Sequence, residues 1–349
     1  MKIQDFDLTG KRTFIIAELS ANHNGSLKNA LDTIKAAKRA GADSIKLQTY
    51  TADTLTLNSS KSDFKINGTI WDGKNYYDLY KEAYTPWEWH EQLFSAAADE
   101  GLICFSSPFD KTSVDFLEKL GAPAYKIASF EITDIPLIEY VASKGKPVII
   151  STGIAELEDI ELAVETCKKA GNYSIALLKC TSSYPAPINE ANMCMVKDLA
   201  DRFGVISGLS DHTIGSTVPI VATCFGAKII EKHFILDRSV GGPDASFSMN
   251  ELEFTAMVKA VREAESAIGE VNYSLTENQI KGKEFSRSLY VVEDVKAGHI
   301  FTEKNIKSIR PGYGLHPKYY QSILGSKAGK DLEFGDRLNL DDVIFKNMQ

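Results

Sequence analysis

Two lysines end apolar segments of the chain at positions where an anion site could form. Lys46 lies in "DSIKLQ" and Lys126 in "AYKIAS", and comparable positions at the ends of other apolar segments hold Ser107, Ser129 and Ser151. Two ammonium groups beside hydroxyl and backbone N–H groups are a typical environment for a phosphate or a carboxylate. A Schiff-base role for one lysine, or a purely structural role, remains open.

Two histidines end consecutive apolar segments. His212 lies in "GLSDHT" and His233 in "KIIEKHF". If these segments are neighbouring strands, the two imidazoles can share one divalent cation and leave positions open for water or a substrate oxygen. A single histidine at such a place is more often a structural residue or a general base, so the metal interpretation depends on the pairing.

Acidic residues complete the set of candidates. Glu18 ends "TFIIAEL" and Glu131 lies in "YKIASFE", and each is a candidate for acid–base chemistry or for binding a hydroxyl group. Either glutamate could instead form a structural ion pair with a strand-end lysine. Asp244 lies in the turn "GGPDASFS", as a ligand or as a turn former. Glu231 also lies at a segment end, and the sequence assigns no role to it.

These residues need a fold in which the ends of many strands converge. Short β-branched segments alternate with helical patterns up to about residue 235, and the strand candidates are "TFIIAEL", "DSIKLQ", "LICFSS", "AYKIAS", "PVIIST", "SIALLKC", "VISGLS" and "KIIEKHF". Eight strand–helix pairs predict a (β/α)8 TIM barrel, whose active-site residues come from the C-terminal strand ends. A doubly wound open sheet is the alternative, but no GxGxxG motif follows the first strand.

One connection is longer than a simple loop. Residues 50–84 separate the second strand from a helix that we expect to start at "TPWEWHEQ", with Thr85 as N-cap and Pro86 as its first residue. Long loops on a compact scaffold usually carry function. We therefore expect this loop to contribute to the site.

The chain divides into a barrel domain over residues 1–268, a polar linker over 269–285 and a small, turn-rich domain over 286–349. The net charge of −8 argues against a nucleic-acid binder. We read no signal peptide and no run of about 18 apolar residues, so we expect no membrane span. Five cysteines without a CxxC pair favour a reducing compartment, so we expect a cytoplasmic protein.

A series of motifs resembles the sialic acid synthase family, the phosphoenolpyruvate-dependent nonulosonate synthases. In chain order they are "AELSANHNG", "IKLQTY", "FSSPFD", "YKIASFE", "IISTG", "KCTSSYPAP", "GLSDHT", "EKHF" and "GGPDASFSM". They occur in family order across residues 14–249, and the segment from about residue 286 looks like the family's antifreeze-like (SAF) domain. The resemblance implies a TIM barrel followed by that small domain.

The resemblance also implies a role for each matching residue. The phosphate and carboxylate of phosphoenolpyruvate would be held by Lys46, Ser107, Lys126, Ser129, Ser151, Ser182 and Ser210. The amino sugar would face Glu18, Gln48, Tyr184 and Asp244, with Glu131 as the principal acid–base residue. A divalent ion, Mn2+ or else Mg2+ or Co2+, would bind His212 and His233. Family members are domain-swapped homodimers, so Arg310, or alternatively Arg287, would reach the sugar in the partner's barrel.

Within the family, "GTIWDGKNYYDLYKEAYTPWEWH" looks most like the branch that makes pseudaminic acid. That branch condenses phosphoenolpyruvate with 2,4-diacetamido-2,4,6-trideoxy-L-altrose, and the long loop is where branches should differ. Synthesis of N-acetylneuraminate or legionaminic acid is the alternative within the family. A lysine Schiff-base aldolase on the same barrel and a non-enzymatic sugar-binding protein are the alternatives outside it.

Overall fold

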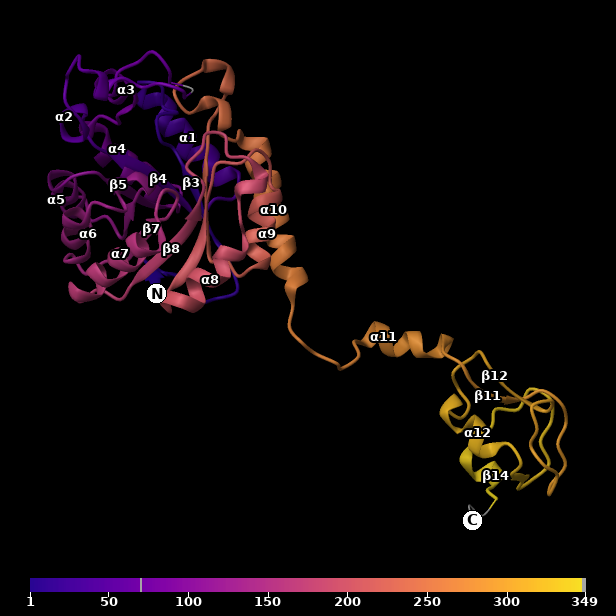
Figure 1. Ribbon diagram of the computed structural model, residues 1–349. Helices are drawn as coiled ribbons and strands as arrows, with labels where there is room; N and C mark the ends of the chain where they lie inside the picture. The colour runs from indigo at the N-terminus through magenta and orange to yellow at the C-terminus, as the bar shows by residue number, and fades with distance from the viewer. Residues whose placement is uncertain (70, 347–349) are drawn as a thin grey trace. The chain divides into compact units, whose positions relative to one another are not determined.

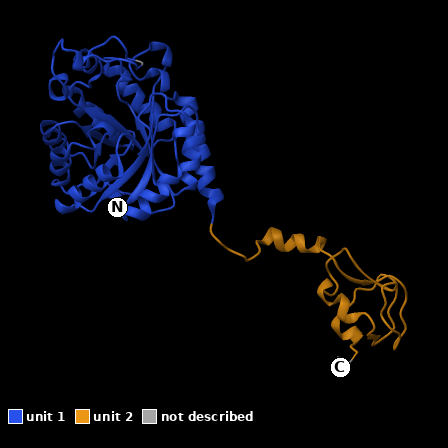
Figure 2. Cartoon of the chain, in the orientation of Figure 1, with its two compact units in different colours: residues 1–269 blue, residues 270–349 orange. Residues whose placement is uncertain are grey.

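A computed structural model describes residues 1–69 and 71–346. In it, the chain folds into two compact units. The larger unit spans Met1–Gly269 and the smaller one Glu270–Gln349 (Figure 2). Each unit buries a hydrophobic core of its own.

Eight parallel strands close into a barrel in the larger unit (Figure 1), which confirms the predicted (β/α)8 fold. Around the barrel the strands are β3 (Phe14–Glu18), β4 (Ser44–Thr49), β5 (Ile103–Pro108), β6 (Tyr125–Ile127), β7 (Val148–Ser151), β8 (Ile175–Cys180), β9 (Ile206–Asp211) and β10 (Ile229–His233). β10 pairs with β3 and closes the barrel, with His233 opposite Glu18. The alternative of an open doubly wound sheet is wrong.

Helices follow the strands and pack against the outer face of the barrel wall. They are α1 (Leu27–Arg39), α4 (His90–Asp99), α5 (Lys111–Lys119), α6 (Ile135–Ala142), α7 (Leu157–Lys169), α8 (Cys194–Phe203), α9 (Thr217–Cys224) and α10 (Glu251–Ile268). Capping side chains set the helix starts: Ser26 accepts a hydrogen bond from the N–H of Asn29, and Asn250 forms a capping box with Glu253. An N-terminal hairpin consists of β1 (Lys2–Ile3) and β2 (Phe6–Asp7).

Alternate residues of each strand face opposite sides of the barrel wall. In β3, Ile15 and Ala17 pack with the surrounding helices, whereas Phe14 and Ile16 pack with inward residues of the other strands. Glu18 continues the inward series and is fully buried. The same alternation therefore fills the lower barrel with apolar side chains and places polar ones at its C-terminal mouth.

The long connection after β4 contains two short helices, α2 (Ala52–Leu55) and α3 (Tyr76–Ala83). The next helix begins later than predicted, because Trp87–Trp89 form a 3-10 helix and α4 starts at His90. Pro86, rather than Thr85, is the N-cap of that 3-10 helix. Its extended ψ of 132° delays the first helical turn.

The smaller unit is built from short strands and turns. Its elements are α11 (Glu277–Gly282), β11 (Ser288–Val291), β12 (Ile306–Ile309), α12 (Tyr320–Ile323), β13 (Lys327–Ala328) and β14 (Val343–Ile344). β11 pairs antiparallel with β12, and β13 with β14. α11 lies within the segment expected to be a linker.

In the described part of the chain, no helix is both long and apolar enough to cross a membrane.

Candidate active site

The inward positions at the C-terminal ends of the strands form one polar site. The alternation of side chains along each strand places the following candidates there: Glu18, Lys46, Gln48, Ser107, Lys126, Ser151, Ser210, His212, Glu231 and His233. Four further candidates lie on the segments that follow β6, β8 and β10: Ser129, Ser182, Tyr184 and Asp244. All of these candidates belong to the larger unit.

Two lysines and two glutamates form a buried ionic cluster at the centre of the mouth. Lys46 Nζ lies 2.8 Å from Glu18 Oε2 and 2.8 Å from Glu231 Oε1. Lys126 Nζ lies 3.3 Å from the same Glu231 oxygen, to which Ser210 Oγ donates a hydrogen bond of 3.2 Å. The two predicted anion-binding lysines are thus brought together, and the ion pair considered for Glu18 is present.

Glu231 is the residue whose role the sequence alone did not reveal. Burial by itself would raise its pKa, but the ammonium groups of Lys126 and Lys46 hold that pKa below its usual range. Burial lowers the pKa of Lys46 to about 7, against the opposing effect of Glu231. Glu231 therefore keeps two buried ammonium groups in place, in positions from which they can bind an anion.

Serine hydroxyls next to this cluster either lack partners or pair with each other. Ser107 Oγ and Ser151 Oγ are buried and have no hydrogen-bond partner among the described residues. Ser129 Oγ and Ser182 Oγ are 2.7 Å apart. Buried hydroxyls without partners are costly unless a ligand binds them, so these side chains fit an anionic ligand.

Gly153 is a further residue that the sequence did not single out, although it belongs to "IISTG". A Cβ added there would lie 2.1 Å from Ser182 Oγ, 2.5 Å from Ser129 Oγ and 3.0 Å from Cys180 Sγ. Only a residue without a side chain leaves the serine pair in position.

We predict that Gly153→Ala separates Ser129 from Ser182 and weakens binding of an anionic substrate. Each displaced charge-assisted hydrogen bond contributes roughly 1.5–3 kcal/mol, so KM for that substrate should rise more than about tenfold. Steady-state kinetics measure this. Gly282→Ala is the matched control, because a Cβ there meets nothing within 4 Å; an unchanged KM in Gly153→Ala would contradict the assignment.

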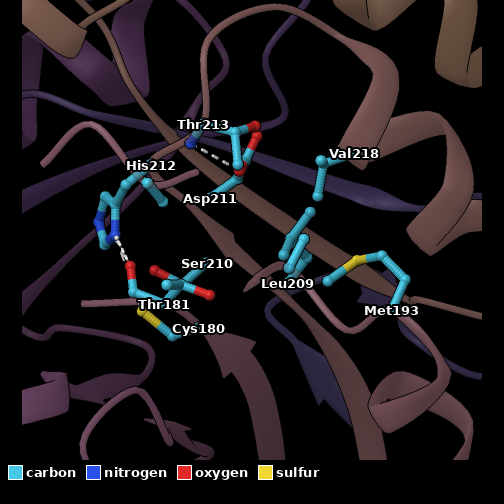
Figure 3. A pocket seen from close by; sticks show the side chains of 11 residues that line it. Cys180, Thr181, Met193, Leu209, Ser210, Asp211, His212, Thr213 and Val218 are labelled. Atoms are coloured by element: carbon cyan, nitrogen blue, oxygen red, sulfur yellow. Dashed lines mark hydrogen bonds between the residues drawn. The ribbon is translucent and has the colours of Figure 1, made fainter. Parts of the chain in front are cut away.

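His212, directly after β9, and His233, the last residue of β10, lie side by side at the ends of neighbouring strands, as predicted, with ring centroids 5.4 Å apart. The carbonyl oxygen of Thr181 can only accept, so His212 Nδ1 donates the hydrogen bond of 3.0 Å between them (Figure 3). In the neutral ring this leaves the lone pair on Nε2 free to bind a cation. Burial disfavours a charge on His212, but contacts with Cys180 and Thr181 raise its pKa, so a bound cation competes with a proton.

The second imidazole is also suited to a metal. His233 Nδ1 is buried without a hydrogen-bond partner among the described residues. Burial, followed by the charges of His212 and Lys46, holds the pKa of His233 well below its usual value, so the ring is neutral. Within the described residues no cluster of three or more His, Cys, Asp or Glu side chains forms a metal cage. The unpartnered Nδ1 of His233 and the Nε2 of His212 are the groups that would hold an ion here, and its other ligands would come from water or substrate.

The remaining predicted residues surround the histidines and the ionic cluster. Gln48 Nε2 donates to Glu18 Oε1 at 3.2 Å. Asp244 Oδ2 accepts from Ser20 Oγ at 2.5 Å and lies 3.8 Å from His233 Nδ1. Burial raises the pKa of Asp244, against the hydrogen bonds from Ser20 and Ala21.

Glu131 has the properties of an acid–base group. Its Oε2 is buried and unpaired within the described residues. Burial raises its pKa to about 7, although Lys126 lowers it in part. A carboxyl group with this pKa can accept and release a proton near neutral pH.

An aromatic wall encloses the histidine side of the mouth. The rings of Tyr184 and His212 are 4.4 Å apart, and Phe247 lies 5.1 Å from Tyr184 and 4.9 Å from His233. Trp71, from the long connection after β4, lies 5.7 Å from Tyr184 and donates its indole N–H to the Pro243 carbonyl at 3.0 Å. The sequence indicated that this connection serves the site but did not identify Trp71 or Phe247.

The two arginine candidates lie in the smaller unit. Arg310 is exposed, and the exposed Arg287 donates to the carbonyl of Ser308 at 2.8 Å. Contact of either arginine with a sugar stays a prediction.

Comparisons with known proteins agree with this arrangement. A family model described as NeuB family matches residues 33–273, and one described as SAF domain matches residues 286–344. The chain is 52% identical over 342 residues to a Pseudaminic acid synthase from Campylobacter jejuni subsp. jejuni serotype O:23/36 (strain 81-176), covering 98% of this chain and 99% of the relative. It is 48% identical over 330 residues to a Pseudaminic acid synthase from Helicobacter pylori (strain ATCC 700392 / 26695), covering 94% and 97%.

A solved structure matches as well. The N-acetylneuraminic acid (sialic acid) synthetase from Leptospira borgpetersenii serovar Hardjo-bovis, in complex with citrate, superposes with a TM-score of 0.73 at 29% identity, covering 82% of this chain and 95% of that one. The predicted C-terminal antifreeze-like domain is confirmed by the SAF match. The resemblance carried by the sequence motifs is therefore confirmed, and the chain belongs to the NeuB family.

Proposed function

We propose that this chain condenses phosphoenolpyruvate with 2,4-diacetamido-2,4,6-trideoxy-L-altrose and water, giving pseudaminic acid and phosphate. The observation that carries the proposal is the identity of 48% and 52%, over nearly the whole chain, to relatives named Pseudaminic acid synthase. The site supports it, because two buried lysines, unpartnered hydroxyls and two imidazoles converge on one barrel mouth.

The lysine and serine side is proposed to bind phosphoenolpyruvate. Lys46 and Lys126 offset the charges of its phosphate and carboxylate, and in a buried site such contacts are stronger than in water. Ser107 and Ser151 donate their unpartnered hydroxyls to the same anion. Bound in this way, C3 of phosphoenolpyruvate, the nucleophilic carbon, is held toward the aldehyde carbon of the open-chain sugar.

A divalent ion belongs to the proposal, Mn2+ or alternatively Mg2+ or Co2+. His212 and His233 would hold it, and the fit rests on the buried, unpartnered Nδ1 of His233 and the fixed tautomer of His212. When bound, such an ion supplies Lewis-acid polarisation of the sugar's carbonyl oxygen.

Glu131 is proposed to act on water. Attack by C3 turns the aldehyde oxygen into an alkoxide and leaves positive charge at C2 of the former phosphoenolpyruvate. Water adds at C2 while Glu131 takes its proton, and Glu131 then passes that proton to the alkoxide. The resulting hemiketal phosphate breaks its C2–O bond. Phosphate leaves with the bridging oxygen, and the oxygen from water becomes the keto oxygen.

The aromatic wall is proposed to face the deoxygenated end of the sugar. The 6-deoxy sugar carries a methyl group at C6, and the rings of Trp71 and Tyr184 offer it an apolar surface. N-acetylmannosamine carries a hydroxyl group at the same carbon, and that group would lose its hydration against these rings.

We predict that Trp71→Ala raises KM for the 6-deoxy sugar about tenfold and leaves KM for phosphoenolpyruvate unchanged. Burying one methyl group contributes roughly 1 kcal/mol, and lost ring contacts add to this. Trp71→Phe keeps a ring but loses the hydrogen bond to Pro243, so it should retain most of the affinity. Equal changes in both KM values would contradict the placement of the sugar.

Phosphoenolpyruvate labelled with 18O at the bridging oxygen tests the reaction class. We expect all label in the released phosphate, because the C2–O bond breaks. Label retained in the keto acid would exclude this reaction for the chain. A sugar-binding protein without activity would release no phosphate at all.

The subunit arrangement and the compartment are also proposals. We propose a domain-swapped homodimer in which residues 286–349, joined to the barrel of residues 1–268 by the segment 269–285, bring Arg310 to the partner's sugar. A charge-reversing Arg310→Glu variant should then raise KM for the sugar. The five free cysteines support a cytoplasmic location, where thiols stay reduced.

A further inference from the structure

A buried ion pair lies directly behind the two histidines. Asp211 precedes His212 at the end of β9, and Lys232 precedes His233 in β10. The two residues are opposite each other in the strand pairing, and Lys232 Nζ lies 2.5 Å from Asp211 Oδ2. Both side chains are only 1% exposed.

The pair also holds the loop that follows His212. Lys232 Nζ donates to the carboxylate of Asp211, to the carbonyl oxygen of Thr213, and to the carbonyl oxygen of Gly215 at 3.3 Å. Asp211 Oδ1 accepts from the Thr213 N–H at 2.9 Å (Figure 3). An ammonium group has three protons, so Lys232 has a partner for each of them.

The position of the pair follows from strand alternation. His212 and His233 belong to the inward series of their strands, so Asp211 and Lys232 belong to the outward series and lie on the opposite side of the barrel wall. A buried ion pair contributes little net stability, whereas loss of one partner leaves an uncompensated buried charge. The pair is therefore better explained by the geometry that it fixes than by stability.

We propose that Asp211 and Lys232 form a clamp that fixes the two histidine imidazoles relative to each other, as positioning residues for a divalent cation. The clamp joins the last residue of β9 to the last but one of β10, so a shift of one strand end against the other would break it. It also anchors residues 213–215, which directly follow His212. The inference rests on the metal site of the proposed function.

Direct binding of Mn2+ to the full chain tests the clamp. The signal of free Mn2+ in electron paramagnetic resonance is measured in the absence of substrates, so that its loss reports Mn2+ bound to the protein. We expect Asp211→Asn and Lys232→Met each to weaken Mn2+ binding by about 10–100-fold, the usual effect of losing a residue that supports a metal ligand. Asp211→Asn keeps the acceptor for Thr213 N–H and removes only the charge, so it is the milder change.

Asp43→Asn is the matched control. Asp43 is also a nearly buried carboxylate with a cationic partner, Arg262, at 2.9 Å, but it lies before β4 at the opposite end of the barrel. We expect this variant to lose stability and to keep the wild-type affinity for Mn2+. Equal weakening in Asp43→Asn, or unchanged binding in both clamp variants, would overturn the inference.

A second measurement separates the clamp from the metal site itself. In the metal-free protein, Asp211→Asn should shift the imidazole NMR signals of His212 and His233 and leave that of the buried His90, which hydrogen-bonds to Thr49 at the end of β4, in place. Unchanged signals for the first pair overturn the clamp whether or not Mn2+ binds. If the wild-type protein binds no divalent ion while these signals do shift, the metal part of the proposed function fails and the geometric role of the clamp stands.

Discussion

Lys126→Met should lower kcat/KM for phosphoenolpyruvate by roughly 10²–10³-fold, the usual loss for one preorganised charge-stabilising donor in a buried site. Lys126 is 2% exposed and shares Glu231 with Lys46. Without it, Glu231 competes with the substrate anion for the remaining ammonium group. Both the binding of phosphoenolpyruvate and the departure of phosphate should suffer, so KM rises and kcat falls.

Lys228→Met is the control for this prediction. Lys228 directly precedes β10 at the opposite end of the barrel and donates to the carbonyl of Gly10 at 2.8 Å. Phosphate release measured at varied phosphoenolpyruvate should be normal in the control. Wild-type kcat/KM in Lys126→Met would contradict anion binding by this lysine. Borohydride inactivation of the wild-type protein in the presence of substrate would favour the Schiff-base aldolase instead.

Glu131→Gln should lower kcat by roughly 10²–10⁴-fold, the range for a lost general base. The active form of Glu131 is the carboxylate, and its pKa is about 7. The rate of the wild-type protein should therefore rise with pH through about 7. In Glu131→Gln the residual rate should lose this acidic limb, because the amide does not titrate.

Lys46 determines the alkaline limb of the pH profile. Its active form is the charged ammonium group, and burial brings its pKa to about 7. kcat/KM for phosphoenolpyruvate should therefore fall as pH rises above about 7, giving a narrow bell together with Glu131. The profile of kcat should extend further to high pH, because the bound anion favours the charged lysine. An acidic limb that persists in Glu131→Gln would show that another group is the base.

Much of the fold and of the site follows from the strand periodicity. Eight apolar segments with helical patterns between them predict the barrel, and the period of two in a strand places Lys46, Lys126, His212 and His233 at its mouth. The structure brings these four residues together as expected. Their roles in binding and catalysis stay predictions.

The features that the sequence did not reveal depend on pairing between distant segments. Glu231 could be recognised as a counter-ion only once two lysines from other strands were known to meet it. The packing of Trp71 on Tyr184 depends on the path of a long loop, which no local periodicity specifies. Asp211 and Lys232 lie next to the histidines in sequence, but their contact requires the register of β9 against β10.

Supplying one sugar at a time to the purified protein, with phosphoenolpyruvate and Mn2+, tests the proposed function most directly. Phosphate release and the mass of the sugar product are measured together. We predict turnover of 2,4-diacetamido-2,4,6-trideoxy-L-altrose, with one phosphate released for each pseudaminic acid formed, and no comparable turnover of N-acetylmannosamine. Turnover of N-acetylmannosamine alone would contradict the assignment, as would binding of the altrose sugar without release of phosphate.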